Sequence, residues 1–438
     1  MSVGEARARA PRHTLARVVG VPGAVLMGLG SVLGTGIFVS IGIAAEVAGA
    51  SLLLALALAA GVAALNGLAS AELAAAHPVS GGTYEYAHQY LHPAFGRVAG
   101  WMFLCAKTAS AATAALGLSG YLLGAFGFEA EAGLRGVAVG GVAGVTSLVA
   151  GGMQRSSRAN GVIVGVTLAA LLAFVAAGAA PLAAAGGAPF TPFLPPDGAR
   201  GLLHATALMF VAYTGYGRIA TLGEEVREPQ RNIPRAIVAT VALSLLLYCG
   251  VAAVAIAAVG ADGLAAATRS HAPPLAAAAR ALGTPGLDRL LAVGAVSAML
   301  SVLLNLVLGL SRVVLAMARR GDLPAAFGVV EPGRSSPRNA VLVTGATIAM
   351  VAALGSVRAA WSFSAFTVLV YYAITNLTAL RLPADRRRFP RWVPACGLLG
   401  CLGLAFWIER EFWLLGIALA LGGLALPFGT RALARRRR

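Results

Sequence analysis

The chain has 438 residues, of which 58% are hydrophobic and only 12% are charged, and its formal net charge is +17. A soluble domain carries about a quarter charged residues, so this composition excludes an ordinary soluble domain. Several apolar runs reach the roughly 20 residues that a helix needs to cross a bilayer. Because backbone groups in lipid must be hydrogen-bonded internally, these continuous runs predict an all-α polytopic membrane protein rather than a barrel of alternating strands.

In chain order, the apolar runs predict twelve membrane spans with short connections. Their expected ranges are 21–44, 51–75, 96–125, 134–151, 159–181, 201–222, 234–259, 288–317, 339–357, 360–380, 391–408 and 411–429. The N-terminal segment 1–20 and the tail 430–438 are basic, and most arginines fall on their side of the membrane. This bias predicts a cytoplasmic (inner) membrane protein with both termini in the cytoplasm, and it explains the positive charge without nucleic acid binding.

Closely spaced glycines interrupt spans 1 and 6. Span 1 contains GLGSVLGTGIF at 28–38, and span 6 contains YTGYG at 213–217. A glycine inside a helix costs roughly 1 kcal/mol relative to alanine, so several together indicate where a helix can open. Opened N–H groups suit a carboxylate, and freed carbonyls suit an ammonium group or a cation. The breaks therefore favour a zwitterion site, and the alternative is that these glycines only allow close helix packing.

Four motifs occur along the chain in a characteristic order. They are GSVLGTGIF at 30–38, PVSGGTY at 78–84, YTGY at 213–216 followed by EEVREPQRNIPR at 224–235, and SR at 311–312 followed by AMARRGDLP at 316–324. With these motifs the chain resembles the amino acid–polyamine–organocation permeases. The resemblance implies a LeuT-type fold, in which 21–181 and 201–380 are inverted five-helix repeats and 391–429 forms two peripheral helices.

The same resemblance implies where a substrate binds. Val32, Thr35 and Gly36 match positions that receive a substrate carboxylate, and the stretch from Val211 to Gly215 matches the opened part of span 6. We therefore expect the substrate to contact residues of both breaks: Val32, Gly34, Thr35, Gly36, Val211, Ala212, Tyr213, Thr214, Gly215 and Tyr216. For the two tyrosines, aromatic packing is the alternative.

Lys107, the only lysine, lies about a dozen residues into span 3. Ionisable residues at membrane depth indicate function, and a desolvated lysine can exchange its proton, so we predict that Lys107 takes part in ion coupling. The alternative is a structural lysine bonded to carbonyl groups. Thr167, which replaces a lysine of related permeases, can form a sodium-like site with Ser297 or Ser301, since hydroxyl groups suit a hard cation. Gly217, followed by Arg218, replaces an acidic residue of many relatives.

Charged residues after span 6 predict an inner gate. Glu224 and Glu225 can form salt bridges with Arg227, Arg231 and Arg235, and the alternative is a solvated loop. The motif at 78–82 predicts a turn, since Gly and Pro set special dihedral angles. His77, His88 and His92 lack the spacing of metal ligands, so neither a metal nor a cofactor is expected.

Together these features predict a secondary transporter of amino acids that works by proton symport or exchange, with protons, or alternatively sodium, as the coupling ion. No Asp or Glu lies at the centre of a span, which favours a neutral amino acid over a cationic one. The alternatives are a cationic amino acid or polyamine antiporter and, from another class, an amino-acid-sensing receptor on a transporter scaffold. An enzyme is not expected, because no acid, histidine cluster or nucleophile lies at membrane depth.

Overall fold

A computed structural model describes residues 19–77, 81–128, 131–152, 157–194, 197–220, 226–270, 272–330, 337–354 and 356–436. Throughout this part of the chain the secondary structure is helical, apart from an isolated bridge between Val19 and Val226. The α-helices are α1 (Val21–Val32), α2 (Thr35–Phe38), α3 (Ser40–Ala48), α4 (Leu52–Ala76), α5 (Thr83–Tyr90), α6 (Pro93–Ala125), α7 (Glu131–Ala150), α8 (Ser157–Ala185), α9 (Ala199–Tyr213), α10 (Gly217–Ala220), α11 (Pro229–Arg269), α12 (Pro274–Ala281), α13 (Leu287–Arg319), α14 (Arg338–Leu354), α15 (Val357–Leu380), α16 (Trp392–Ala405) and α17 (Arg410–Arg436).

The first predicted break is present in span 1. Helix α1 ends at Val32, and Leu33 and Gly34 adopt extended backbone conformations before α2 begins. Helix α2 has only four residues, and a second irregular residue, Val39 (φ −123°, ψ −56°), separates it from α3. The glycine-rich motif therefore opens the helical hydrogen-bond ladder at this point, because two consecutive residues leave the helical conformation.

The break in span 6 is milder than the sequence suggested. Helix α9 passes into a 3-10 turn, η3 (Thr214–Tyr216), and then into α10, while the flanking residues Tyr213 and Gly217 keep helical dihedral angles. A 3-10 turn tightens the helix without freeing a long stretch of backbone. The two breaks are thus unequal, and the more open one lies in span 1.

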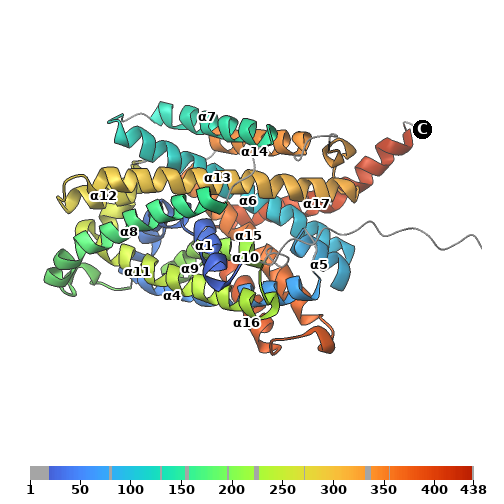
Figure 1. The fold of residues 1–438 in the computed structure, drawn as a ribbon, viewed down its shortest axis with the longest axis horizontal. Coiled ribbons are helices and arrows are strands. Elements are labelled where there is room, and N and C mark those ends of the chain that lie inside the picture. The colour runs from blue at the N-terminus through green and yellow to red at the C-terminus, as the bar shows by residue number, and fades with distance from the viewer. Residues whose placement is uncertain are drawn as a thin grey trace, which may run out of the picture.

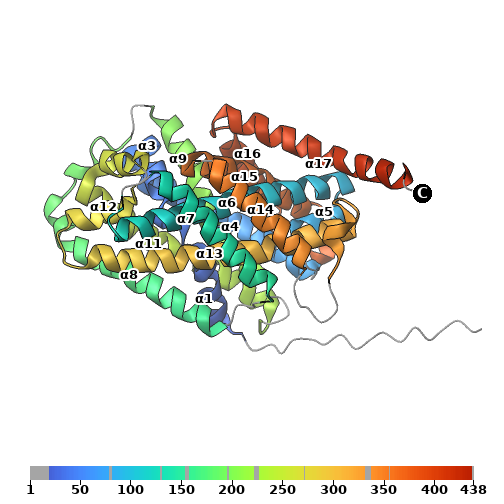
Figure 2. The ribbon, with the colours of Figure 1, turned by 90° about the horizontal axis from the view of Figure 1, so that it is seen from above.

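The helices form one elongated bundle, with α12 at one end and α5 at the other (Figure 1). We call these the α12 end and the α5 end. Helix α6 packs against both α13 and α15 along the bundle, and the broken helices lie beside them with α4 and α11. Helices α7 and α14 form a separate layer over α6 and α13, held by a cluster that includes Ala112, Val142, Val307 and Ile348 (Figures 1 and 2).

Seven helical segments of the described chain are long and apolar enough to cross a bilayer, or eight if the bent pair of α16 and α17 is one span. Each of the twelve predicted ranges contains a helix or a broken helix. Fewer helices than the twelve predicted spans are long enough to cross a bilayer, because the pieces of spans 1 and 6 are too short to cross alone and α14 has only 17 residues. The count of twelve and the inverted-repeat boundaries stay predictions. The chain is a multi-pass helical membrane protein.

Candidate functional site

The two breaks lie against each other at the centre of the bundle. A Cβ atom added to Gly215 would lie 2.2 Å from the carbonyl oxygen of Ser31, and one added to Gly36 would lie 2.4 Å from the Cβ of Ala212. Both distances are far below van der Waals contact, so no larger residue fits at either crossing. The glycines therefore do allow close helix packing, as the alternative interpretation holds. This close packing also brings the two breaks together.

Tyr248 of α11 caps the break in span 1. Its hydroxyl donates a hydrogen bond of 2.8 Å to the carbonyl of Val32, which the break removes from the helical ladder, and lies 3.4 Å from the carbonyl of Ala212. Tyr248 is fully buried, and its ring is 5.3 Å from that of Tyr213. Sequence reasoning missed this residue, although a tyrosine in the middle of an apolar span was an available signal.

Several polar groups at the breaks have no partner. The amide N–H groups of Thr35 and Gly36 lie in the first turn of α2, where amides have no acceptor within their own helix. The Thr35 hydroxyl, 5% exposed, and the Tyr213 hydroxyl, fully buried, are also unpartnered within these ranges. Buried polar groups are normally hydrogen-bonded, so unpaired donors and hydroxyls next to a break indicate a place where a polar solute can bind.

Lys107 reaches the break in span 6. It lies about half-way along α6, and its ammonium group donates a hydrogen bond of 2.9 Å to the hydroxyl of Thr214. That hydroxyl in turn donates to the carbonyl of Val211, and the hydroxyl of Tyr372 lies 3.5 Å from the carbonyl of Thr214. The structure thus joins a residue predicted for ion coupling to one predicted for substrate binding.

The predicted sodium-like set is only partly brought together. The hydroxyl groups of Thr167 and Ser297 both lie near the carbonyl of Gly294, at 3.5 and 3.0 Å. The Ser301 hydroxyl is buried and has no partner among the described residues. Its neighbour Val302 is close to the first break, since a Cβ on Gly34 would lie 2.6 Å from Val302 Cγ2. Ser301 therefore lies near the break, and Thr167 lies beside Gly294, at a different level of α13.

Tyr216, another predicted binding residue, is fully buried and packs against Tyr372, with ring centroids 5.6 Å apart. This arrangement agrees with the aromatic packing alternative.

A cavity beyond the first break, toward the α12 end, is lined by Val39, Gly117, Tyr121 and Pro274 among others. It borders Val39, the residue that follows α2.

The structure describes only part of the predicted inner gate. Glu224 and Glu225 lie outside the described residues. Arg231 is 4.0 Å from Glu228 on an exposed surface, and the amide of Arg227 donates to the carbonyl of Val19. Exposed ion pairs contribute little to stability, so this pair agrees better with the solvated-loop alternative than with a gate.

A polar network does close the α5 end, through residues that sequence reasoning did not assign. Arg320 binds Glu85, and the hydroxyl of Tyr84 donates a hydrogen bond of 2.7 Å to the buried carboxylate of Asp322. Burial, reinforced by this bond to Asp322, raises the pKa of Tyr84 well above its usual range, so Tyr84 remains a donor. These residues come from α5 and from the end of α13, and they tie the two elements together. His88 lies 4.0 Å from Asp322, and in the described ranges no group of His, Cys, Asp or Glu has the arrangement of a metal site.

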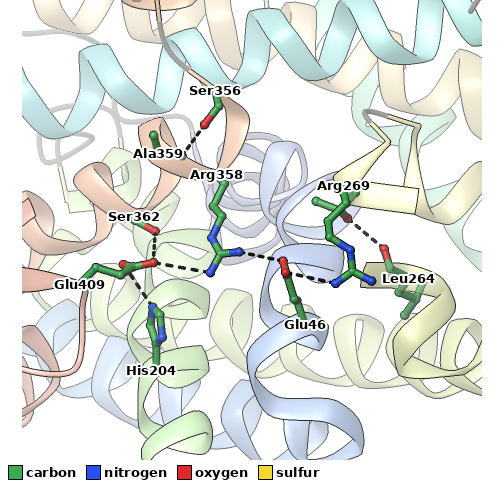
Figure 3. Close-up of polar contacts among 10 residues, drawn as sticks. Glu46, His204, Leu264, Arg269, Ser356, Arg358, Ala359, Ser362 and Glu409 are labelled. Atoms are coloured by element: carbon green, nitrogen blue, oxygen red, sulfur yellow. Dashed lines mark hydrogen bonds and ion pairs between the residues drawn. The ribbon is translucent and has the colours of Figure 1, made fainter. Parts of the chain in front are cut away.

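A second network closes the α12 end (Figure 3). Arg358 of α15 lies 3.1 Å from Glu46 of α3 and 3.9 Å from Glu409, which precedes α17. Arg269 also binds Glu46, and His204 of α9 lies 3.4 Å from Glu409. Burial raises the pKa of Glu409, but the adjacent His204 imidazole and the charge of Arg358 outweigh it and hold the pKa below its usual range. The network joins α3 and α9, the pieces that follow and precede the breaks, to α15.

Comparisons with known proteins agree with this architecture. A family model described as amino acid permease matches residues 23–422. An uncharacterized transporter of Mycobacterium tuberculosis is 43% identical over 427 residues, which cover 97% of this chain and 93% of that protein. The methylthioribose transporter of Bacillus subtilis is 30% identical, over 79% of this chain and 76% of that protein. The crystal structure of MhsT in complex with L-phenylalanine, a LeuT-like protein, has a TM-score of 0.65 at 17% identity, covering 93% of this chain and 100% of that one.

Proposed function

The chain belongs to the amino acid permease family, and from this premise we propose that it is a secondary active transporter that moves amino acids across the cytoplasmic membrane by proton symport or exchange. The family consists of permeases, and the chain is accordingly a transporter and not an enzyme. The observation that carries the proposal is the crossing of the two helix breaks at Gly215 and Ser31, with unpaired donors beside it. Transporters of this architecture bind their solute at such broken helices.

The substrate-binding residues in this proposal are those of the two breaks. The amides of Thr35 and Gly36 suit the carboxylate of an amino acid, because the first N–H groups of a helical segment have no acceptor within that segment. The unpartnered hydroxyl of Tyr213 suits the polar groups on the other side of the solute. The domains follow the same plan, with repeats over 21–181 and 201–380 and peripheral helices over 391–429.

Alternating access requires that each end of the bundle open in turn. We assign the α5 end to the cytoplasm and, as the arginine distribution predicts, both termini to the same side of the membrane. The network around Arg320 and Asp322 then acts at the cytoplasmic end, and the network around Arg358 and Glu409 acts at the external end. Glu224, Glu225, Arg227 and Arg231 remain the further candidates for the cytoplasmic gate.

Lys107 is the proposed proton-binding residue. Its hydrogen bond to Thr214 connects its charge directly to the break in span 6. Thr167 and Ser301 are the candidates for a cation site, and the unpartnered hydroxyl of Ser301 beside the first break supports this assignment. Sodium is the alternative coupling ion if this pair, rather than Lys107, carries the coupling.

The test is uptake of radiolabelled amino acids into proteoliposomes that contain the purified full-length chain, with and without an imposed pH gradient. Saturable uptake that a pH gradient accelerates is the expected result for symport, and uptake that depends on internal amino acid is expected for exchange. Ligand-induced thermal stabilisation without flux would instead favour the sensing receptor. Absence of both flux and binding for every amino acid and polyamine would refute the proposal.

A further inference from the structure

Lys107 carries an isolated charge within the bundle. It is the only lysine of the chain and lies about half-way along α6, which spans the full length of the bundle. An ammonium group has three donors, and its one hydrogen bond in the described structure goes to the hydroxyl of Thr214. Two donors and the whole positive charge are left for another partner.

No carboxylate of the described chain supplies that partner. At the α12 end, Glu46 and Glu409 bind Arg358, and Glu85 binds an arginine at the α5 end. No ion pair joins Lys107 to an acidic side chain anywhere in the ranges that the structure describes. An ionised group inside a membrane protein is costly unless it is paired, so the missing negative charge is expected to come from outside the chain.

The position of the ammonium group indicates what brings that charge. Thr214, its partner, directly precedes Gly215, whose backbone touches that of Ser31 where the two breaks cross. Lys107 also keeps accessible surface, in contrast to its fully buried neighbour Ala106. The charge therefore lies at the edge of the proposed binding site and is available to a solute that occupies it.

We propose that Lys107 binds an acidic group of the solute, so that the transporter selects amino acids with a carboxylate side chain. This inference rests on the proposed function and specifies the substrate class of the same site. In the proposed function the first break receives the α-carboxylate, and Lys107 provides a separate cation for the second carboxylate. A site built around a buried charged group discriminates strongly against an analogue that leaves the group unpaired.

The same pairing couples the solute to a proton. Because the unpaired ammonium ion is costly inside the bundle, Lys107 gives up its proton in the empty site, and it takes one proton from solution when the carboxylate of the solute arrives to neutralise the charge. Binding of the anion and binding of the proton favour each other, because linkage between two ligands is reciprocal. When the ion pair separates on the other side, the solute leaves as an anion and the amine returns its proton, so one proton moves with each solute.

The experiment compares acidic amino acids with their uncharged amides of nearly equal size. Proteoliposomes with the full-length chain are assayed for uptake of radiolabelled L-glutamate, L-aspartate, L-glutamine and L-asparagine, and internal pyranine records proton entry. We expect kcat/KM for an acid to exceed that of its amide by about tenfold or more, with acidification of the lumen. Lys107→Gln is expected to reverse this preference and abolish acidification, and Lys107→Arg is expected to retain the preference.

Arg312→Gln is the matched control, because it removes one positive charge from an exposed position on α13 and leaves the breaks untouched. It is expected to keep the wild-type selectivity. Thermal unfolding of each variant separates loss of selectivity from loss of folding, and a folded Lys107→Arg keeps the test informative if Lys107→Gln unfolds. Equal transport of acids and amides by the wild type, or an unchanged ratio in folded Lys107→Gln, would overturn the inference while the proposed transport function stands. Absence of flux for all amino acids would refute the proposed function itself.

Discussion

Gly215→Ala tests the idea that the two breaks must touch. A Cβ atom at residue 215 would lie 2.2 Å from the carbonyl oxygen of Ser31, 2.4 Å from its carbonyl carbon and 2.6 Å from the nitrogen of Val32. All three are backbone atoms, so no side-chain rotation can relieve the overlap. To restore an ordinary contact of about 3.5 Å, the two helices must move apart by about 1 Å at their crossing.

The cost of this separation follows from the packing around it. Overpacking a core by one methyl group typically costs about 1–3 kcal/mol. The upper part of that range is expected here, since the hydroxyl of Tyr248 holds the carbonyl of Val32, one of the residues in the clash. We therefore expect a lower unfolding temperature and a loss of most transport activity, because the solute-binding groups of the two breaks no longer face each other at the same distance.

The assay combines thermal unfolding of the detergent-solubilised protein with initial rates of amino acid uptake in proteoliposomes. Gly144→Ala is the matched control: it is the same substitution, in α7, at a helical glycine with no atom within 4 Å of an added Cβ. Alanine there is expected to leave transport unchanged and to stabilise the helix by about 1 kcal/mol. If Gly215→Ala unfolds at the wild-type temperature and transports at the wild-type rate, the crossing does not constrain the breaks and the reasoning is wrong.

Three further predictions concern individual hydrogen bonds and ion pairs. Tyr248→Phe removes the donor to the buried carbonyl of Val32 and is expected to lower the free energy of unfolding by about 1–3 kcal/mol; an unchanged unfolding temperature would show that this carbonyl is satisfied in another way. Tyr84→Phe leaves the buried Asp322 carboxylate without its hydroxyl donor, so a loss of about 1.5–3 kcal/mol is expected in the same assay, and a loss below about 0.5 kcal/mol would contradict it. Because the pKa of Glu409 is depressed in the folded state, its stabilising effect is present above the unfolded value of about 4.3 and is lost as the pH falls through the folded value. Unfolding temperatures of the wild type and Glu409→Gln should therefore differ at pH 7 and converge as the pH falls toward 3, and a gap that persists there would refute the assignment.

Much of the fold could be predicted from the sequence because its signals are local. Apolar runs long enough to cross a bilayer, with polar residues between them, predicted the helical membrane protein, and each expected range contains a helix or a broken helix. Leu33 and Gly34 leave the helical conformation within the predicted glycine-rich motif of span 1. Four motifs in order indicated the family, which the match over residues 23–422 shows.

The sequence by itself thus determined that the chain is a membrane protein, where its helices lie, which family it belongs to and where the first break is. Each of these depends on residues that are neighbours in the chain. Only the tertiary structure decided which groups meet at the breaks. The bonds from Tyr248 to Val32 and from Lys107 to Thr214 join residues far apart in the chain, and the network of Glu46, Arg358 and Glu409 spans even longer separations. Such contacts depend on how whole helices pack against one another, and local patterns of hydrophobicity and glycine spacing do not predict that packing.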